Sequence, residues 1–367
     1  MSDYISELRR DLVEAAERQA HAGRAGRVAR PLRPRAWSPP AVAGTLAIAA
    51  LLAAVVLTLT TLAPPPKPSD AKVVTTVRLG GQPYDAVIAA GSLWIADFEG
   101  RVTRLDPATR RVRGSVRVGG TPVSIAADGD VVWVMSNDSS PDASRSHLIK
   151  LDARSGKILA RVPVNGYGGR VEAGAGGLWL VPDRHSGNLE RIDPDSFERT
   201  SFVRLGGHAT EGLSGGLSVS GNSVWTREFE SVLEIDGRSG RVVSRVRTGS
   251  PPLHFDTQRS LLAEGDGMWV VGPTDGVLMR IERGGVTQRI TVGVTADYVA
   301  RVGSFIWVAA SRGPGSGFEV VRVDPDEGKV VERVRVGHDE PRTLVPAGRD
   351  LWVVTSGGSA LLVTPGR

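Results

Sequence analysis

The sequence contains no cysteine, which excludes disulfide bonds, thiolate metal ligands and a cysteine nucleophile. Histidine is also scarce, and the 6 histidines among 367 residues show no metal-binding spacing. No phosphate-binding loop, dinucleotide fingerprint or G-x-S-x-G motif occurs in the context that its chemistry needs. The chain therefore lacks the usual signatures of redox, nucleotide-dependent and serine-hydrolase enzymes.

A large net charge is missing too. The chain has 45 basic and 40 acidic residues, and eight of the basic and five of the acidic residues lie in residues 1–40. That stretch carries +3, so all the other residues together carry only +2. A nearly neutral chain has no electrostatic footprint for DNA or RNA, and we predict no nucleic-acid partner.

One long uncharged run is present, from Ala41 to Ala63, and it is long enough to cross a bilayer with some tilt. Five arginines precede it within residues 23–40, so the positive-inside rule places the N-terminus in the cytoplasm. A cleaved signal peptide is the alternative, but three prolines directly after the run disfavour cleavage. We predict a single-pass cell-membrane protein whose C-terminal part is extracytoplasmic.

The segments that flank this run have separate predicted roles. Residues 1–22 are predicted to form a short cytoplasmic amphipathic helix, with apolar residues at helical spacing over residues 2–20. That helix is either fully solvated or docks on a cytoplasmic partner or on the membrane. Residues 23–40 form an Arg/Pro-rich linker, residues 41–63 the transmembrane helix and residues 64–71 a stiff Pro-rich spacer.

The rest of the sequence is a repeat of about forty residues. Each copy has four short apolar runs separated by Gly, Asp or Pro turns, as in residues 83–119. A tryptophan in the second run recurs seven times, at spacings of 38 to 46 residues. Most third runs end in an acid, often followed by Pro or Gly, which favours a type I turn. Four strands at this period are typical of a β-propeller blade.

The two ends of the repeat region complement each other. Lys72–Gly80 aligns without gaps on the fourth run Lys329–Gly337, and the last repeat stops after its third run, at Pro365. We therefore predict an all-β, seven-bladed propeller of four-stranded antiparallel blades over residues 72–367, with the N-terminal strand closing the last blade. Fourth-run arginines such as Arg245 and Arg333 are expected at the outer rim, where charge discourages edge-to-edge pairing.

Three motifs carry a resemblance to a known family. They are Val116–Pro122 (V-R-V-G-G-T-P), Gly91–Ile95 (G-S-L-W-I) and Val323–Val330 (V-D-P-D-E-G-K-V). Together they resemble the YVTN and streptogramin-lyase-like group of β-propellers, over nearly all of residues 72–367. The resemblance implies the propeller fold, while the functions of such repeats range over scaffolds, sensors and a few enzymes.

Polar residues gather where the first runs begin, which a propeller brings to one mouth of its channel. They either bind a ligand there or are solvated loop residues. The candidate ligand-binding residues are Tyr84, Asp85, Asp97, Arg170, Asp256, Asp297, Tyr298 and Arg342.

The resemblance also implies an alternative activity. Streptogramin lyases open a cyclic ester by elimination, using a His base, a nearby Glu and a magnesium ion. Here, only Asp97 and Glu228 are acidic at the end of the second run, where those enzymes tend to carry Glu, and no H-x-H pair with a partner Glu occurs. We therefore favour an extracytoplasmic ligand- or protein-binding or sensing module without a cofactor, and keep a magnesium-dependent C–O lyase of the virginiamycin B lyase type as the alternative. The candidate catalytic residues for that lyase are His208, Glu211, His254 and Glu228.

Overall fold

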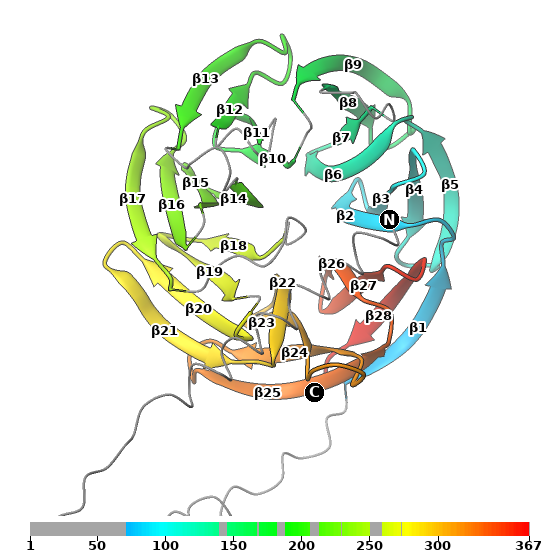
Figure 1. The fold of residues 1–367 in the computed structure, drawn as a ribbon. Helices are drawn as coiled ribbons and strands as arrows, with labels where there is room; N and C mark the ends of the chain where they lie inside the picture. Colours follow the sequence, from blue (N-terminus) through cyan, green and yellow to red (C-terminus); the bar gives the residue numbers. More distant parts are fainter. Residues whose placement is uncertain are drawn as a thin grey trace, which may run out of the picture. The chain divides into compact units, whose positions relative to one another are not determined.

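Seven four-stranded antiparallel sheets surround a common centre like the blades of a propeller (Figure 1). The structure, a computed structural model, describes residues 71–138, 145–166, 169–181, 188–205, 213–228, 230–249, 259–272 and 274–366. Within these ranges the chain has no helix long and apolar enough to cross a bilayer. The predicted cytoplasmic helix, linker, membrane span and most of the spacer lie outside the described residues.

Each blade runs from an inner strand at the centre to an outer strand at the perimeter. The inner strands are β2 (Pro83–Ala89), β6 (Thr121–Asp128), β10 (Val171–Gly174), β14 (Leu213–Ser220), β18 (Leu261–Glu264), β22 (Thr295–Val302) and β26 (Pro341–Ala347). The second strands are β3 (Ser92–Asp97), β7 (Val131–Asn137), β11 (Gly177–Leu180), β15 (Ser223–Glu228), β19 (Gly267–Gly272), β23 (Phe305–Ser311) and β27 (Asp350–Thr355). The third strands are β4 (Arg101–Asp106), β8 (Arg145–Asp152), β12 (Asn188–Ile192), β16 (Ser231–Asp236), β20 (Val277–Glu282), β24 (Phe318–Asp324) and β28 (Ser359–Thr364). The outer strands are β5 (Arg111–Arg117), β9 (Ile158–Asn165), β13 (Arg199–Arg204), β17 (Val242–Arg247), β21 (Gly285–Thr291), β25 (Lys329–Gly337) and β1 (Lys72–Arg78).

Blades are numbered from the one that contains β2, so blade 7 consists of β26, β27, β28 and β1. The mouth face of the ring is the face at which inner strands begin and second strands end. The turn face is the opposite one, where outer strands begin and where the turns between third and outer strands lie.

The N-terminal strand closes the ring as the sequence predicted. β1 pairs antiparallel with β28, with Lys72 opposite Thr364 and Arg78 opposite Ser359. Figure 1 shows the first and last strands of the chain side by side at the perimeter. The pairing covers the free edge of β28, which would otherwise offer unpaired N–H and C=O groups to other chains.

The core consists of apolar layers between adjacent blades. Trp94, for example, has no exposed surface and packs with Val132 and Ile149 of the next blade. The seven repeat tryptophans are all at most 3% exposed, and a buried aromatic side chain of this size stabilises a fold by about 3–5 kcal/mol. This explains the period of the sequence, because each blade must supply one large side chain to fill the gap to its neighbour.

The acids that end the third strands form the predicted turns. The Asp106 carboxylate accepts the backbone N–H groups of Ala108 and Thr109, at 2.9 and 3.1 Å. Hydrogen bonds from the Arg113 side chain and from these turn N–H groups lower the pKa of Asp106 to about 2. The same N–H contacts recur at Asp193 and Asp324.

A cation opposite the tryptophan ties most blades to the next one. On the third strand it donates to a backbone carbonyl of the following blade, just after that blade's own third strand. The contacts are Arg104 Nη1 to Arg154 O (2.5 Å), Lys150 Nζ to Pro194 O (3.0 Å), Arg191 Nη1 to Gly237 O (3.0 Å) and Arg322 Nη1 to Gly366 O (3.3 Å). Blade 7 has Leu362 at this position. Blade 4 has Glu234 and blade 5 has Arg280, which turns back to Glu264 of its own blade. Cavities of about 620 and 450 Å³ occupy these two junctions on either side of blade 5.

Outer-strand arginines make a second set of ties, which the sequence-based interpretation as rim charges missed. Arg245 Nη2 donates to Leu205 O at 3.2 Å, and Arg333 Nη1 donates to Val292 O at 2.7 Å. Arg289 contacts Thr248 O in the same way, at 2.8 Å. Each guanidinium thus binds a carbonyl at the end of the preceding blade's outer strand. These residues therefore hold adjacent blades together, in addition to placing charge at the outer rim.

Candidate functional site

Four inner strands begin with a β-bulge at the mouth face. In each one the pairing with the second strand skips one residue, and the skipped residues are Tyr84 in β2, Val123 in β6, Asp297 in β22 and Arg342 in β26. A bulge bends its strand and re-aims the side chain, and bulges are over-represented beside functional sites. Three of these four residues are among the ligand-binding candidates predicted from sequence.

The residue after the first bulge, Asp85, is the centre of a buried ion cluster. Its carboxylate accepts Arg259 Nε at 2.6 Å, Arg170 Nη1 at 3.2 Å and the Ile125 backbone N–H at 3.0 Å. Burial by itself raises the pKa of Asp85, but the Arg259 and Arg170 guanidinium groups outweigh burial and hold the pKa below its usual value. Asp85 is therefore a structural anion at neutral pH.

The cluster links blades that are not neighbours. Arg259 lies two residues before the start of β18 in blade 5, and Figure 1 places β18 and β2 on opposite sides of the ring centre. Arg170 and Arg259 also contact Glu172 of blade 3, and Arg259 Nη2 donates to Ile125 O of blade 2 at 3.0 Å. These paired charges connect opposite walls of the central channel at its mouth.

A second group of polar residues lies on blades 6, 7 and 1. Burial raises the pKa of Asp297 to about 6, with Glu340 adding to the shift and Arg342 opposing it. Arg342 Nη2 lies 3.3 Å from the Glu340 carboxylate, and its guanidinium lies 5.8 Å from the centre of the Tyr84 ring. Tyr84 in turn packs on Phe98, with ring centres 4.3 Å apart. This arrangement offers a carboxyl that titrates near neutral pH beside a cation and an aromatic wall.

The other predicted residues have different positions. Asp97 caps its own turn by accepting the Glu99 N–H at 2.7 Å, and its pKa is raised chiefly by burial. Tyr298 is 3% exposed and packs into the apolar layer between blades 6 and 7. Glu228 lies at the mouth end of β15, where its carboxylate is bound by Arg245 of the same blade. His208, Glu211, His254 and Asp256 lie outside the described residues, so their roles stay predictions.

Sequence reasoning missed Arg259, Glu172 and Glu340. Each lies within two residues of the start of an inner strand, so position along the repeat was an available signal. Position along the repeat was not sufficient to identify these residues, because the repeat does not show which residues at the starts of inner strands contact one another across the channel. Among the residues that the structure describes, no group of three or more His, Asp or Glu side chains is arranged to hold a metal ion.

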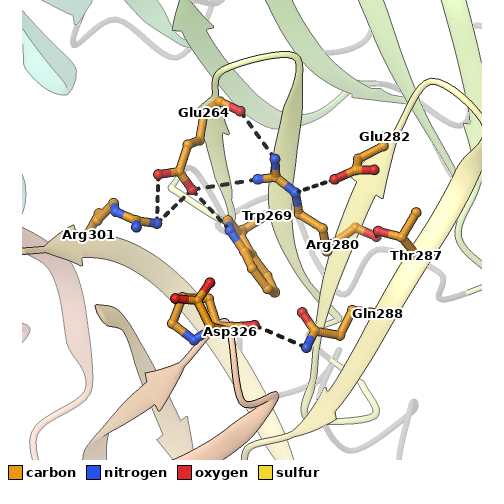
Figure 2. A pocket seen from close by; sticks show the side chains of 9 residues that line it. Glu264, Trp269, Arg280, Glu282, Thr287, Gln288, Arg301 and Asp326 are labelled. Atoms are coloured by element: carbon orange, nitrogen blue, oxygen red, sulfur yellow. Dashed lines mark hydrogen bonds and ion pairs between the residues drawn. The ribbon is translucent and has the colours of Figure 1, made fainter. Parts of the chain in front are cut away.

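The cavity between blades 5 and 6 is a second polar site, on the turn face (Figure 2). Its charged groups largely neutralise one another. The Glu264 carboxylate accepts Arg301 Nη1 at 2.7 Å and Trp269 Nε1 at 3.2 Å, and lies 3.6 Å from Arg280. Because both arginines are already bound to Glu264, the mouth face with its titratable Asp297 is the better candidate.

Comparisons with known proteins support the fold and do not identify a function. No protein-family model matches the sequence, and no curated protein matches it. Among solved structures, that of selenomethionine-substituted virginiamycin B lyase from Staphylococcus aureus aligns with a TM-score of 0.64 at 14% identity. The alignment covers 80% of this chain and 99% of that one. At this identity the likeness shows a shared seven-bladed propeller fold alone, and the YVTN assignment stays a prediction.

Proposed function

We propose that this protein is a membrane-tethered, extracytoplasmic binding module whose ligand contacts Asp297, Glu340, Arg342 and Tyr84 at the mouth face. The observation that supports this proposal is the unfavourable environment of the Asp297 carboxylate. Burial works against its charge, and among the described residues none donates a hydrogen bond to its carboxylate. A carboxyl kept in such a position destabilises the fold at neutral pH, which is typical of residues retained for binding or catalysis.

The charges suggest the chemical class of ligand. Asp297 and Glu340 place two acidic groups beside the Arg342 cation, and the Tyr84 ring lies next to that cation. A primary amine or another small cation would compensate the half-buried carboxylate of Asp297, and Arg342 would donate hydrogen bonds to an acidic or carbonyl group of the same ligand. Because Asp297 is protonated below a pH of about 6, such a ligand should bind more tightly at pH 7.5 than at pH 5.

Asp297→Asn is expected to stabilise the protein at pH 7.5. The unfolded carboxyl titrates near 4 and the folded one near 6, so wild type loses stability as the pH rises from 4 to 6 and stays penalised above 6. A shift of about 2 units corresponds to at most about 3 kcal/mol, or about 5 °C in Tm for a domain of this size. Thermal melts between pH 4 and 8 measure the difference, which should vanish at the acid end.

The same melts test the binding role, with a panel of small amines and amino sugars as probes. A bound amine should raise the Tm of wild type at pH 7.5, and the Asn variant should lose at least about tenfold in affinity. Asp326→Asn is the matched control, because Asp326 is an exposed acid on the turn face. Amines that bind both variants and wild type equally would contradict the proposed site.

The tether rests on sequence alone. The uncharged run from Ala41 to Ala63 and the five arginines before it support an anchor with the N-terminus in the cytoplasm. The ring would then lie outside the membrane, with residues 2–20 left to meet a cytoplasmic partner.

The lyase alternative is favoured by one observation, the structural likeness to virginiamycin B lyase. Its candidate residues do not strengthen it, since Glu228 is held by Arg245 and the others lie outside the described residues. Magnesium-dependent opening of a cyclic depsipeptide by the purified protein, lost in His254→Ala or His208→Ala, would replace the binding-only proposal.

A further inference from the structure

Two neighbouring outer strands, β5 and β9, expose aliphatic side chains where they begin, at the turn face. Val112 of β5 is 44% exposed, and Ile158 and Leu159 of β9 are 37% and 49% exposed. β1, which follows next along the perimeter, begins with the half-buried Val73 and Val74 (Figure 1). Together with the basic residues named next, these positions form what we call the β1–β5–β9 patch.

The patch is basic as well as aliphatic. Lys72, Arg110, Arg111 and Lys157 are all exposed, and within the described ranges none of them forms an ion pair. Arg110 Nη1 donates to Thr75 Oγ1 at 3.2 Å, which joins the β1 and β5 parts of the patch. The nearby acid Asp106 is already bound by Arg113, and Asp130 by Arg154 at 2.8 Å.

The opposite side of the turn face, in blade 6, is acidic. In blade 6 the turn before β25 carries Asp324, Asp326 and Glu327, and its Lys329 is paired with Glu327 at 2.5 Å. Blade 4 also has exposed basic residues that form no ion pair within the described ranges, Arg238 and Arg241, next to the exposed Val242 and Val243. The choice between these two basic sectors therefore depends on where the chain enters the ring.

The chain enters the ring at the β1–β5–β9 patch. Lys72 is the first residue of β1, and eight residues, 64–71, separate it from Ala63 at the end of the uncharged run. A Pro-rich chain extends about 3.1 Å per residue, so eight residues reach about 25 Å. A bilayer that held the run would therefore be within reach of the residues at the start of β1.

We infer that the β1–β5–β9 patch docks on a bilayer surface that carries anionic headgroups. The inference rests on the proposed tether and adds an orientation, in which the mouth face points away from the lipid. Aliphatic side chains would enter the headgroup region, and Lys72, Arg110, Arg111 and Lys157 would lie among the phosphates.

The lack of cysteine makes a direct test simple. Single cysteines replace Val112 and Ile158 in the patch and, as a matched control, Val294, which is 52% exposed in the loop at the mouth face. Each full-length variant carries a fluorophore and is reconstituted in vesicles with and without phosphatidylglycerol. Spin-labelled lipids should quench the labels at residues 112 and 158 and leave the label at residue 294 at background. Equal quenching at all three positions would overturn the inference.

Charge reversal gives a second readout. A basic side chain near an anionic surface contributes about fivefold to binding, so Arg111→Glu with Lys157→Glu should reduce quenching at residue 112 to the level at residue 294. Both residues are exposed, so an unchanged Tm shows that the fold is intact. Quenching that is insensitive to this pair and to lipid charge would contradict the docking surface, as would cross-linking at residue 112 between two copies of the chain.

The tether is tested separately by extraction with alkaline carbonate. If the full chain is released, the tether proposal fails, and flotation of the released chain with anionic vesicles then decides the docking alone. Binding that is lost in the charge-reversed variant supports the patch, and no binding overturns it.

Discussion

Asp85→Ala is expected to destabilise the ring by about 3–5 kcal/mol, the cost of removing one partner from a buried ion pair. Asp85 is 2% exposed and Arg170 is 1% exposed, so the substitution removes a buried carboxylate that binds both Arg170 and Arg259 and leaves these two cations facing Glu172. Urea unfolding at pH 7.5, followed by tryptophan fluorescence, measures the loss.

Asp130→Ala is the matched control for Asp85→Ala. Asp130 forms an ion pair with Arg154 at 2.8 Å, but both side chains are more than half exposed, and exposed pairs contribute only about 0–1 kcal/mol. The pair Asp85→Ala with Arg259→Leu should cost less than the sum of its parts, because the second change removes one of the two cations that Asp85 had paired. Equal effects of the two alanine variants would mean that water reaches the cluster and screens it.

The cluster also gives stability a definite pH dependence. The pKa of Asp85 is lowered by its arginines, so its contribution is present above the unfolded pKa of about 4 and is lost as the pH falls below it. Asp297 acts in the opposite sense, since its raised pKa costs stability as the pH rises from 4 to 6. Wild type should therefore be most stable in mildly acidic solution. Asp297→Asn should remove the loss of stability between pH 4 and 6, and Asp85→Ala should reduce the loss at lower pH, to which Asp106 also contributes.

Removal of β1 is expected to abolish cooperative folding of the ring. A chain that begins at Gly80 leaves the edge of β28 unpaired and uncovers the apolar layers on both sides of blade 7, where Val73, Val74 and Val77 pack. The lost contacts are comparable with the whole stability of a typical domain, about 5–15 kcal/mol. Gel filtration and circular dichroism should show aggregation and no sharp melting transition.

The control for this deletion is a chain that begins at Asp70 and keeps β1. We expect it to stay monomeric and to melt cooperatively, because the ring closes on itself within residues 71–366. If the chain without β1 were also monomeric and melted within a few degrees of this control, closure by the N-terminal strand would not contribute to stability.

The sequence predicted the fold because its signals are local. The tryptophan spacing reports the blade number, since every blade must fill the same gap to its neighbour. The Asp turns depend on contacts within a few residues of the chain. Lys72–Gly80 is recognisable as an outer strand because it matches Lys329–Gly337. The contacts of individual side chains between blades could not be predicted from the sequence. Arg245 and Arg333 read as rim charges because the sequence does not show which carbonyl a side chain meets in the blade before it.

For the candidate site, the sequence determined where the residues lie and the tertiary structure determined what they do. Sequence alone determined that Tyr84, Asp85, Arg170, Asp297 and Arg342 lie at the starts of inner strands, because strand position follows from the period of the repeat. Only the tertiary structure decided their roles. Asp85 meets Arg259 across 174 positions of sequence, and that pairing makes one carboxyl an anion at neutral pH, while burial raises the pKa of Asp297 to about 6. Charge state depends on what surrounds a group in space, and closure of the ring brings those surroundings together from distant parts of the chain.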